Sequence, residues 1–188
     1  EAPNPLPDCL ENMLHQKLLR HADRDRLGEV KVQVVSPGGE VAALLKKRKP
    51  ALKKVFDTIS KAKGGRLLFG KNVLELDVLV NVLGERKVLA ELTVTPVTAV
   101  KGHVQPEVHS NLSALDIKGA FVSCQDGENG DEGAATIDVD EFLVCLALCG
   151  HVKYEEVEQM SLAMRVSGIF ANFLGEKDEQ KVITEAVV

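Results

Sequence analysis

The residues best suited to chemistry are the acidic side chains between Asp126 and Glu141. This stretch of the 188-residue chain contains seven Asp or Glu and no Lys, Arg or His. Carboxylate oxygens are the ligands that Ca²⁺ prefers, so the stretch favours a divalent cation. The same composition is also typical of a solvated acidic loop. The candidate metal ligands are Asp126, Glu128, Asp131, Asp138 and Glu141.

Basic side chains gather between Val41 and Lys71, where ten Lys or Arg accompany a single acid, Asp57. A solvated helix face explains such a run as well as a binding surface does. If the run binds a partner, an acidic protein surface such as the tails of tubulin fits better than nucleic acid, because no aromatic residues interleave to stack bases. The candidate partner-binding residues are Lys46, Lys47, Arg48, Lys49, Lys53 and Lys54.

The stretch from Gly65 to Lys71 matches the G-x4-G-K part of a phosphate-binding loop. In such a loop, backbone N–H groups and the lysine hold phosphates and a following hydroxyl holds Mg²⁺, but here Asn72 replaces that hydroxyl. A phosphate loop also follows a buried parallel strand, whereas a basic amphipathic helix is predicted before Gly65. Nucleotide binding by Gly65 to Lys71 is therefore an alternative hypothesis and not the main one.

No spacing in the sequence indicates a Ser/His/Asp or Cys/His arrangement, so we predict no catalytic residues and a non-enzymatic protein. Cys145 and Cys149 lie four residues apart on one predicted helix face, with His151 nearby. Zinc would need Cys124 to come close as a further ligand. The apolar neighbours of the two cysteines favour a place in the core instead.

Composition limits the fold and the compartment. With 45% hydrophobic residues, 27% charged residues and a net charge of −5, the chain suits one sizeable core or two small ones. The charge argues against a general nucleic-acid coat. No apolar run approaches the roughly 18 residues of a membrane span. The four unevenly spaced cysteines favour a reducing compartment, so we expect a cytoplasmic protein that binds neither nucleic acid nor membrane.

Periodicity in the first half predicts four elements after an N-terminal helix that extends to about His21. Alternation over Val30 to Val35 predicts a strand, which ends at the turn signal Ser36 to Gly39. Two short abutting helices follow, the second beginning at Pro50. A third helix includes Val73 and ends at Gly84.

The second half begins with a segment that we expect to be extended, around Thr93 to Thr98 and Gln105 to Pro106. Asn111 or Ser113 can cap the next helix. The acidic stretch comes next, and a strongly apolar helix continues to Gly150. A last helix is predicted from Glu155 to about Leu174.

The segment Ile137 to Phe142, followed by apolar residues at helical spacing, resembles the second half of an EF-hand. The resemblance makes Ile137 the strand residue and Glu141 the bidentate Ca²⁺ ligand. Counting back from Glu141 places Gly130 at loop position 1 and alanine at positions 5 and 6, so leading ligands and the turn glycine are missing. A longer loop that starts at Asp126 would restore acidic side chains.

The stretch from Leu52 to Leu83 resembles a partner hand without ligands. With Leu68 as its strand residue, Lys61, Lys63 and Gly65 fall at positions 1, 3 and 5, and Asn72 at position 12. EF-hands pair through their short loop strands, so this resemblance implies a structural partner for the second hand.

The tail from Val157 to Glu179 also resembles degenerate calmodulin-like modules of flagellar and axoneme-associated proteins. Together these resemblances predict a mainly α fold, an EF-hand-like pair with short loop strands, an N-terminal arm and a C-terminal packing helix. We expect a structural adaptor that binds other proteins of a cytoskeletal assembly in a cilium or flagellum, tubulin or axonemal scaffold proteins among them.

A calcium-responsive sensor, whose groove would be lined by Phe142, Met160 and Met164, is the first alternative. The expected divisions are 1–38 (arm), 39–84 (first unit), 85–113 (connector) and 114–188 (second unit with the C-terminal helix).

Overall fold

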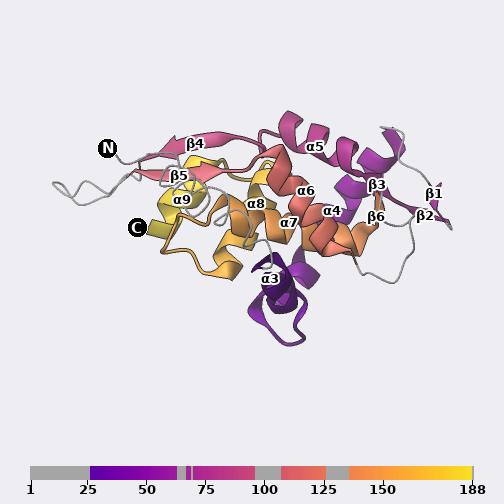
Figure 1. The fold of residues 1–188 in the computed structure, drawn as a ribbon, viewed down its shortest axis with the longest axis horizontal. Helices are drawn as coiled ribbons and strands as arrows, with labels where there is room; N and C mark the ends of the chain where they lie inside the picture. The colour runs from indigo at the N-terminus through magenta and orange to yellow at the C-terminus, as the bar shows by residue number, and fades with distance from the viewer. Residues whose placement is uncertain (1–25, 63–66, 69, 96–106, 126–135, 188) are drawn as a thin grey trace, which may run out of the picture.

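The computed structural model describes residues 26–62, 67–68, 70–95, 107–125 and 136–187. This part of the chain is mainly helical and has three two-stranded antiparallel sheets, so the predicted mainly α class is confirmed. None of the described helices has both the length and the apolar character needed to cross a bilayer. The elements, shown in Figure 1, are α3 (Arg26–Val35), α4 (Glu40–Ala62), β1 (Leu67–Leu68), β2 (Lys71–Asn72), β3 (Leu74–Glu75), α5 (Leu76–Glu85), β4 (Glu91–Val94), β5 (Val108–Asn111), α6 (Ala114–Cys124), β6 (Thr136–Ile137), α7 (Val139–Lys153), α8 (Leu162–Leu174) and α9 (Glu179–Val187).

The core forms around α7, the apolar helix predicted after the acidic stretch. Nine of its fifteen residues are buried, and they lie on every side of the helix. A helix that is apolar all round must be enclosed by other elements. The helices α3, α4, α6 and α8 pack against it, and Figure 1 shows α7 in the middle of the molecule.

The prediction of a strand over Val30 to Val35 is wrong, because these residues belong to the helix α3. The valines at 30, 32 and 34 alternate as in a strand, but Leu27, Val30 and Val34 also recur at helical spacing. Those three side chains are buried, whereas Val32 and Val35 are exposed. Since α6 and α7 offer an apolar surface to cover, helical packing outweighs the strand propensity of valine.

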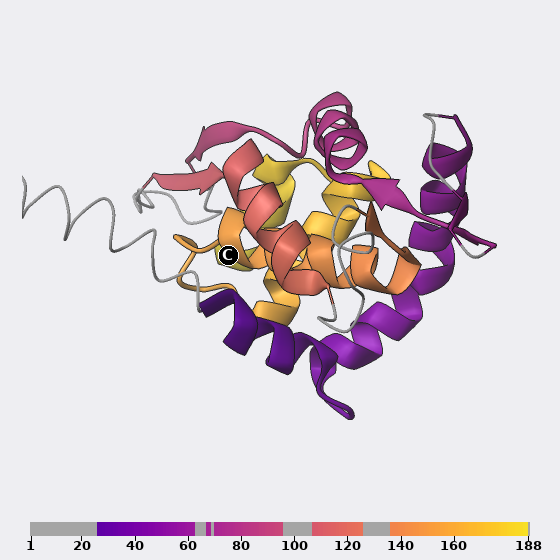
Figure 2. The same cartoon turned by 45° about the vertical axis from the view of Figure 1, so that its right-hand side comes forward.

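One helix of 23 residues, α4, replaces the two abutting helices predicted around Pro50. Pro50 has no N–H to donate to the carbonyl of Lys46. Both residues are exposed, so the Lys46 carbonyl is open to hydration, while Leu52 and Phe56 stay buried on the opposite side. Figure 2 shows α4 as a long curved helix along one side of the molecule.

Two short strands, β3 and β6, join distant parts of the chain. They pair antiparallel, with Leu74 opposite Ile137, and both side chains are fully buried. A helix follows each strand, α5 after β3 and α7 after β6. The prediction that Leu68 is the strand residue facing the second unit is wrong, since β1 pairs locally with β2 through a turn at Gly70.

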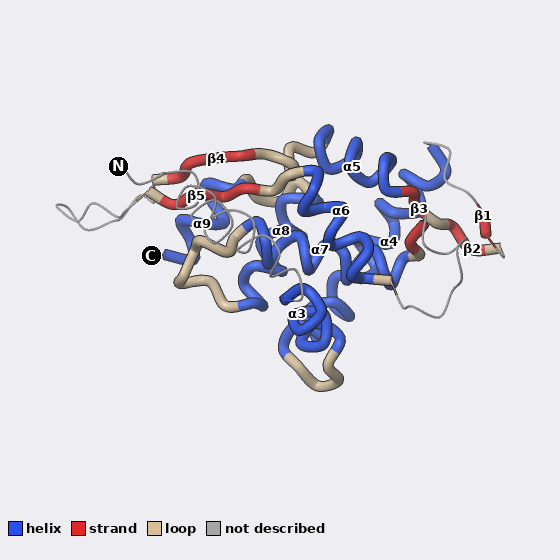
Figure 3. Tube along the Cα trace, viewed as in Figure 1, coloured by secondary structure: helices blue, strands red, loops and turns tan. Residues whose placement is uncertain are grey.

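The helix α5 begins after Val73, which lies outside it, and does not end at Gly84 as predicted. Its last residue is Glu85, and the chain then turns through Lys87, whose φ of 58° lies in the left-handed region. The following segment leads into β4, which pairs with β5. The predicted extended conformation is thus confirmed at Thr93 and Val94, while residues 96–106 lie outside the described chain. Figure 3 shows β4 and β5 at the opposite end of the molecule from β1 and β2.

The C-terminal part contains two helices where one was predicted. The helix α8 begins at Leu162 and not at Glu155, because turns occupy the residues in between. The unexpected helix α9 packs on α8, with Val182 and Ile183 buried. Gly168 permits this approach, since a Cβ atom there would lie 2.6 Å from a methyl of Val182.

Buried polar groups fix α9 and the turn before β4 to the core. Lys153, only 1% exposed, forms an ion pair with Glu179 and donates a hydrogen bond to the carbonyl of Val88. Burial lowers the pKa of Lys153, so the carboxylate and the carbonyl offset the cost of its charge. The neighbouring Tyr154 hydroxyl donates to Asn172 Oδ1.

Tyr154 determines part of the stability in alkaline solution. Burial raises the pKa of its hydroxyl above the ordinary value, so the folded protein keeps a proton that the unfolded chain releases. The contribution of Tyr154 is therefore complete below about pH 10 and is lost above it, at up to about 1.4 kcal/mol per pH unit. Urea unfolding between about pH 9 and pH 11 should show a steeper fall in the wild type than in Y154F. Equal slopes would contradict this assignment.

Candidate functional site

Two of the five candidate metal ligands, Asp138 and Glu141, lie at the start of α7. The Asp138 carboxylate accepts hydrogen bonds from the backbone N–H groups of Asp140 and Glu141, at 2.9 and 3.1 Å. The Glu141 carboxylate in turn accepts from the N–H of Asp138 at 2.8 Å. This reciprocal capping box satisfies N–H groups that the first turn of a helix leaves unpaired. Both carboxylates therefore have a structural role in starting α7.

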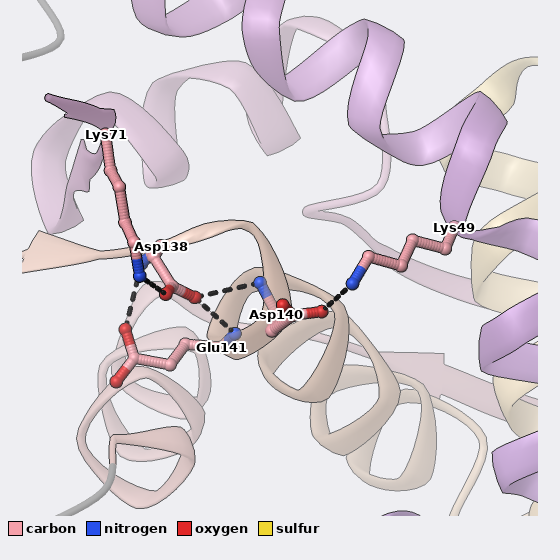
Figure 4. Close-up of polar contacts among 5 residues, drawn as sticks. All are labelled: Lys49, Lys71, Asp138, Asp140 and Glu141. Atoms are coloured by element: carbon pink, nitrogen blue, oxygen red, sulfur yellow. Dashed lines mark hydrogen bonds and ion pairs between the residues drawn. The ribbon is translucent and has the colours of Figure 1, made fainter.

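Two lysines bring positive charge to the same place, as Figure 4 shows. Lys49, from α4, forms an ion pair with Asp140, and the Nζ atom of Lys71, from β2, lies 3.9 Å from Asp138 Oδ2. Side chains of α4 and β2 thus place positive charge beside the carboxylates at the start of α7. Because these pairs are partly exposed, each contributes modestly to stability.

The other three candidate ligands, Asp126, Glu128 and Asp131, lie outside the described residues. Within the described part of the chain, no three His, Cys, Asp or Glu side chains come together in a way that could hold a metal ion. The described residues therefore contribute two potential Ca²⁺ ligands, and both carboxylates already accept backbone hydrogen bonds.

The groove expected in a calcium sensor is filled by the chain's own helix α8. The ring of Phe142 is fully buried between Phe56 and Phe173, with ring centroids 5.2 and 5.6 Å away. Met160 is also buried, and only Met164 keeps an exposed surface, 39% of the residue. Sequence analysis missed this arrangement because the apolar stripe of α8 does not reveal which surface it covers.

The six predicted partner-binding residues divide into two groups. Arg48 and Lys49 form ion pairs within the molecule, Arg48 with Glu176 at 2.8 Å. Lys46, Lys47, Lys53 and Lys54 are exposed on the outer side of α4.

Lys53 pairs with Asp57 on the same helix, at 2.9 Å. Hydrogen bonds from Lys53 and Asn72 lower the pKa of Asp57. Lys61 belongs to the same exposed side and was not predicted as a partner-binding residue. Its helical spacing from Lys54 could have identified it.

The described residues of the phosphate-loop pattern lie in two short strands and the turn at Gly70 between them. Leu67 and Leu68 pair with Lys71 and Asn72 in the β1–β2 sheet, and α5 begins only at Leu76. A phosphate loop requires a helix to begin at the lysine, so that its N–H groups face the anion. This placement does not favour the nucleotide hypothesis.

Cys145 and Cys149 lie in the core, as predicted, and Cys124 lies there too. Cys124, Cys145 and Cys149 are free thiols and are buried. Contacts with the thiols of Cys124 and Cys149, together with burial, raise the pKa of the Cys145 thiol. A buried thiol that resists ionisation is a poor nucleophile and a poor metal ligand.

Comparisons with known proteins give no relatives for this chain. No protein-family model matches the sequence, and no curated protein or solved structure matches it either.

Two substitutions separate the roles of the capping carboxylates. D138A removes the acceptor for two backbone N–H groups and should lower the free energy of unfolding by about 1 to 2 kcal/mol. E141Q keeps an oxygen that can accept from the N–H of Asp138, so its cost should stay below about 0.5 kcal/mol. Urea unfolding at neutral pH measures both. An equal loss in the two variants would contradict the assignment of Asp138 as the principal cap.

Proposed function

We propose that this chain is a non-catalytic adaptor, in which two EF-hand-like units pair as a fixed scaffold for protein–protein contacts in a cytoskeletal assembly. The observation that carries the proposal is the β3–β6 pair, in which Leu74 lies opposite Ile137. EF-hands pair through short loop strands of this kind, each followed by an exiting helix. Helices flank the short strands in both halves of the chain: α4 and α5 lie on either side of β1, β2 and β3, and α6 and α7 lie on either side of β6.

The residues at the ligand positions favour a scaffold over a switch. With Leu74 as the strand residue, Lys71 falls at loop position 5 of the first unit and Val78 at position 12, where the family has its glutamate. Neither side chain can bind Ca²⁺. In the second unit, Lys49 and Lys71 already lie beside the carboxylates at the start of α7.

The packing of α8 supports the same conclusion. A sensor exposes its groove when Ca²⁺ binds, and the groove then receives a partner helix. In this chain, opening would separate Phe142 from Phe173 and expose a fully buried cluster. Such a loss of apolar burial costs several kcal/mol, which favours a groove that stays filled.

The cytoskeletal setting follows from the resemblance of residues 157–179 to axonemal calmodulin-like modules and from the basic outer side of α4. The proposed partners are tubulin or axonemal scaffold proteins in a cilium or flagellum. A calcium sensor is the second candidate, because Asp138 and Glu141 are spaced as loop positions 9 and 12 of an EF-hand. No observation favours nucleotide binding.

Calcium titration separates the two candidates. A fixed scaffold should give no saturable heat with micromolar Ca²⁺ in isothermal titration, and its melting temperature should be the same in Ca²⁺ and in EGTA. E141Q serves as the matched control, since it removes only the charge of the position-12 carboxylate. Heat that saturates in the wild type and disappears in E141Q would establish the sensor instead.

Co-sedimentation tests the cytoskeletal setting. The purified chain should pellet with microtubules or demembranated axonemes to the same extent in Ca²⁺ and in EGTA. The bound fraction should fall as salt is raised, because exposed lysines would carry the contact. Wild-type protein that stays in the supernatant with both filaments at low salt would contradict the proposed setting.

A further inference from the structure

The outer side of α4 carries five lysines in one stripe. With about 100° of rotation per residue, these side chains fall within about 120° of the helix circumference. The opposite side buries Leu52, Phe56 and Ile59. The stripe consists of Lys46, Lys47, Lys53, Lys54 and Lys61, and is called the lysine stripe below.

Most of the charge on the lysine stripe is not neutralised. Within α4, all of which is described, Asp57 is the one acid beside the stripe, and it pairs with Lys53. Lys46, Lys47, Lys54 and Lys61 are exposed, and their ammonium groups form no ion pair or hydrogen bond with another described residue, although Asp57 also attracts Lys61 at longer range. Four ammonium groups therefore face solvent over about 22 Å of helix.

Two ion pairs attach α4 to the body of the protein and leave the lysine stripe on the outer side of the helix. Arg48 pairs with Glu176, just after α8, and Lys49 pairs with Asp140 at the start of α7. These basic residues contact the body of the protein, while the lysine stripe faces away from it. The helix α4 therefore carries more positive side chains than its ion pairs with described residues neutralise.

The chemistry of the lysine stripe selects among anionic partners. It contains no arginine, so it offers no planar fork for bidentate contact with phosphate or guanine. No aromatic side chain lies in it to stack on a base, and no large apolar side chain to enter a lipid surface. Lysine ammonium groups are mobile point charges, which suit carboxylates spaced along a flexible chain.

Between these side chains lies a shallow depression open to solvent, lined by Pro50, Lys53, Lys54, Asp57, Thr58 and Lys61. It provides room for side chains of a bound segment between Lys54 and Lys61. We propose that the lysine stripe binds an extended acidic polypeptide of about seven residues, whose carboxylates contact Lys46, Lys47, Lys54 and Lys61. This inference rests on the proposed adaptor function and specifies the class of partner.

The test compares two variants of equal net charge. The first, K46Q/K54Q/K61Q, removes three charges from the stripe. The second, K87Q/K118Q/K181Q, removes three exposed lysines from other elements. The probe is a fluorescein-labelled decapeptide of glutamate, and its fluorescence anisotropy is measured at low salt. The wild type should bind it saturably, the stripe variant at least about tenfold more weakly, and the control variant within about twofold of wild type.

Three results would overturn the inference. An equal loss in both variants would show attraction by overall charge. Equal competition by a single-stranded DNA of ten phosphates would show binding of any polyanion. Stripe-dependent binding to vesicles containing phosphatidylserine, without peptide binding, would identify a membrane surface instead.

Failure here is distinguishable from failure of the proposed function. If the wild type co-sediments with filaments but does not bind the peptide, the adaptor function stands and the contact lies elsewhere. If it binds the peptide but neither filament, the lysine stripe stands and the cytoskeletal setting does not.

Discussion

The need to enclose α7 governs the architecture of this protein. Its buried side chains occupy most of its circumference, so helices from both halves of the chain must surround it. This requirement explains why Arg26–Val35 is a helix and why α8 lies against Phe142. The surface of α7 around Phe142 is therefore covered by α8.

Charged and polar contacts gather at the start of α7, next to the buried core. The capping box of Asp138 and Glu141 starts the helix locally, while Lys49 of α4 pairs with Asp140 and Lys71 of β2 lies beside Asp138. The neighbouring β3–β6 pair adds backbone hydrogen bonds and buries two apolar side chains. Ion pairs, backbone hydrogen bonds and apolar burial thus join α4, β2 and β3 to β6 and the start of α7 at one place.

Local patterns predicted what local interactions determine. The helix α7, the Ser113 cap and the buried cysteines follow from apolar runs and capping chemistry. The valines of α3 satisfy two periodicities, and only the packing surface chooses between them. Leu68 and Leu74 are equally apolar, so the choice of strand depends on a partner far along the chain. Of the candidate site, Asp138 and Glu141 are neighbours through their spacing alone and form the cap of α7, but the Lys49–Asp140 pair spans 91 residues and leaves no sequence signal.

The curvature of α4 lets one side of the helix pack on the core while the other side, which carries the lysine stripe, faces solvent. Pro50 lies on the exposed side, within the lysine stripe, and a helix bends away from its proline because the ring clashes with the preceding turn. The exposed side of α4 is therefore convex, which agrees with the curved path seen in Figure 2. On a convex surface, lysine side chains diverge, so their mutual repulsion decreases. The proline that costs a backbone hydrogen bond thus helps α4 follow the core and spreads its uncompensated charge over a longer surface.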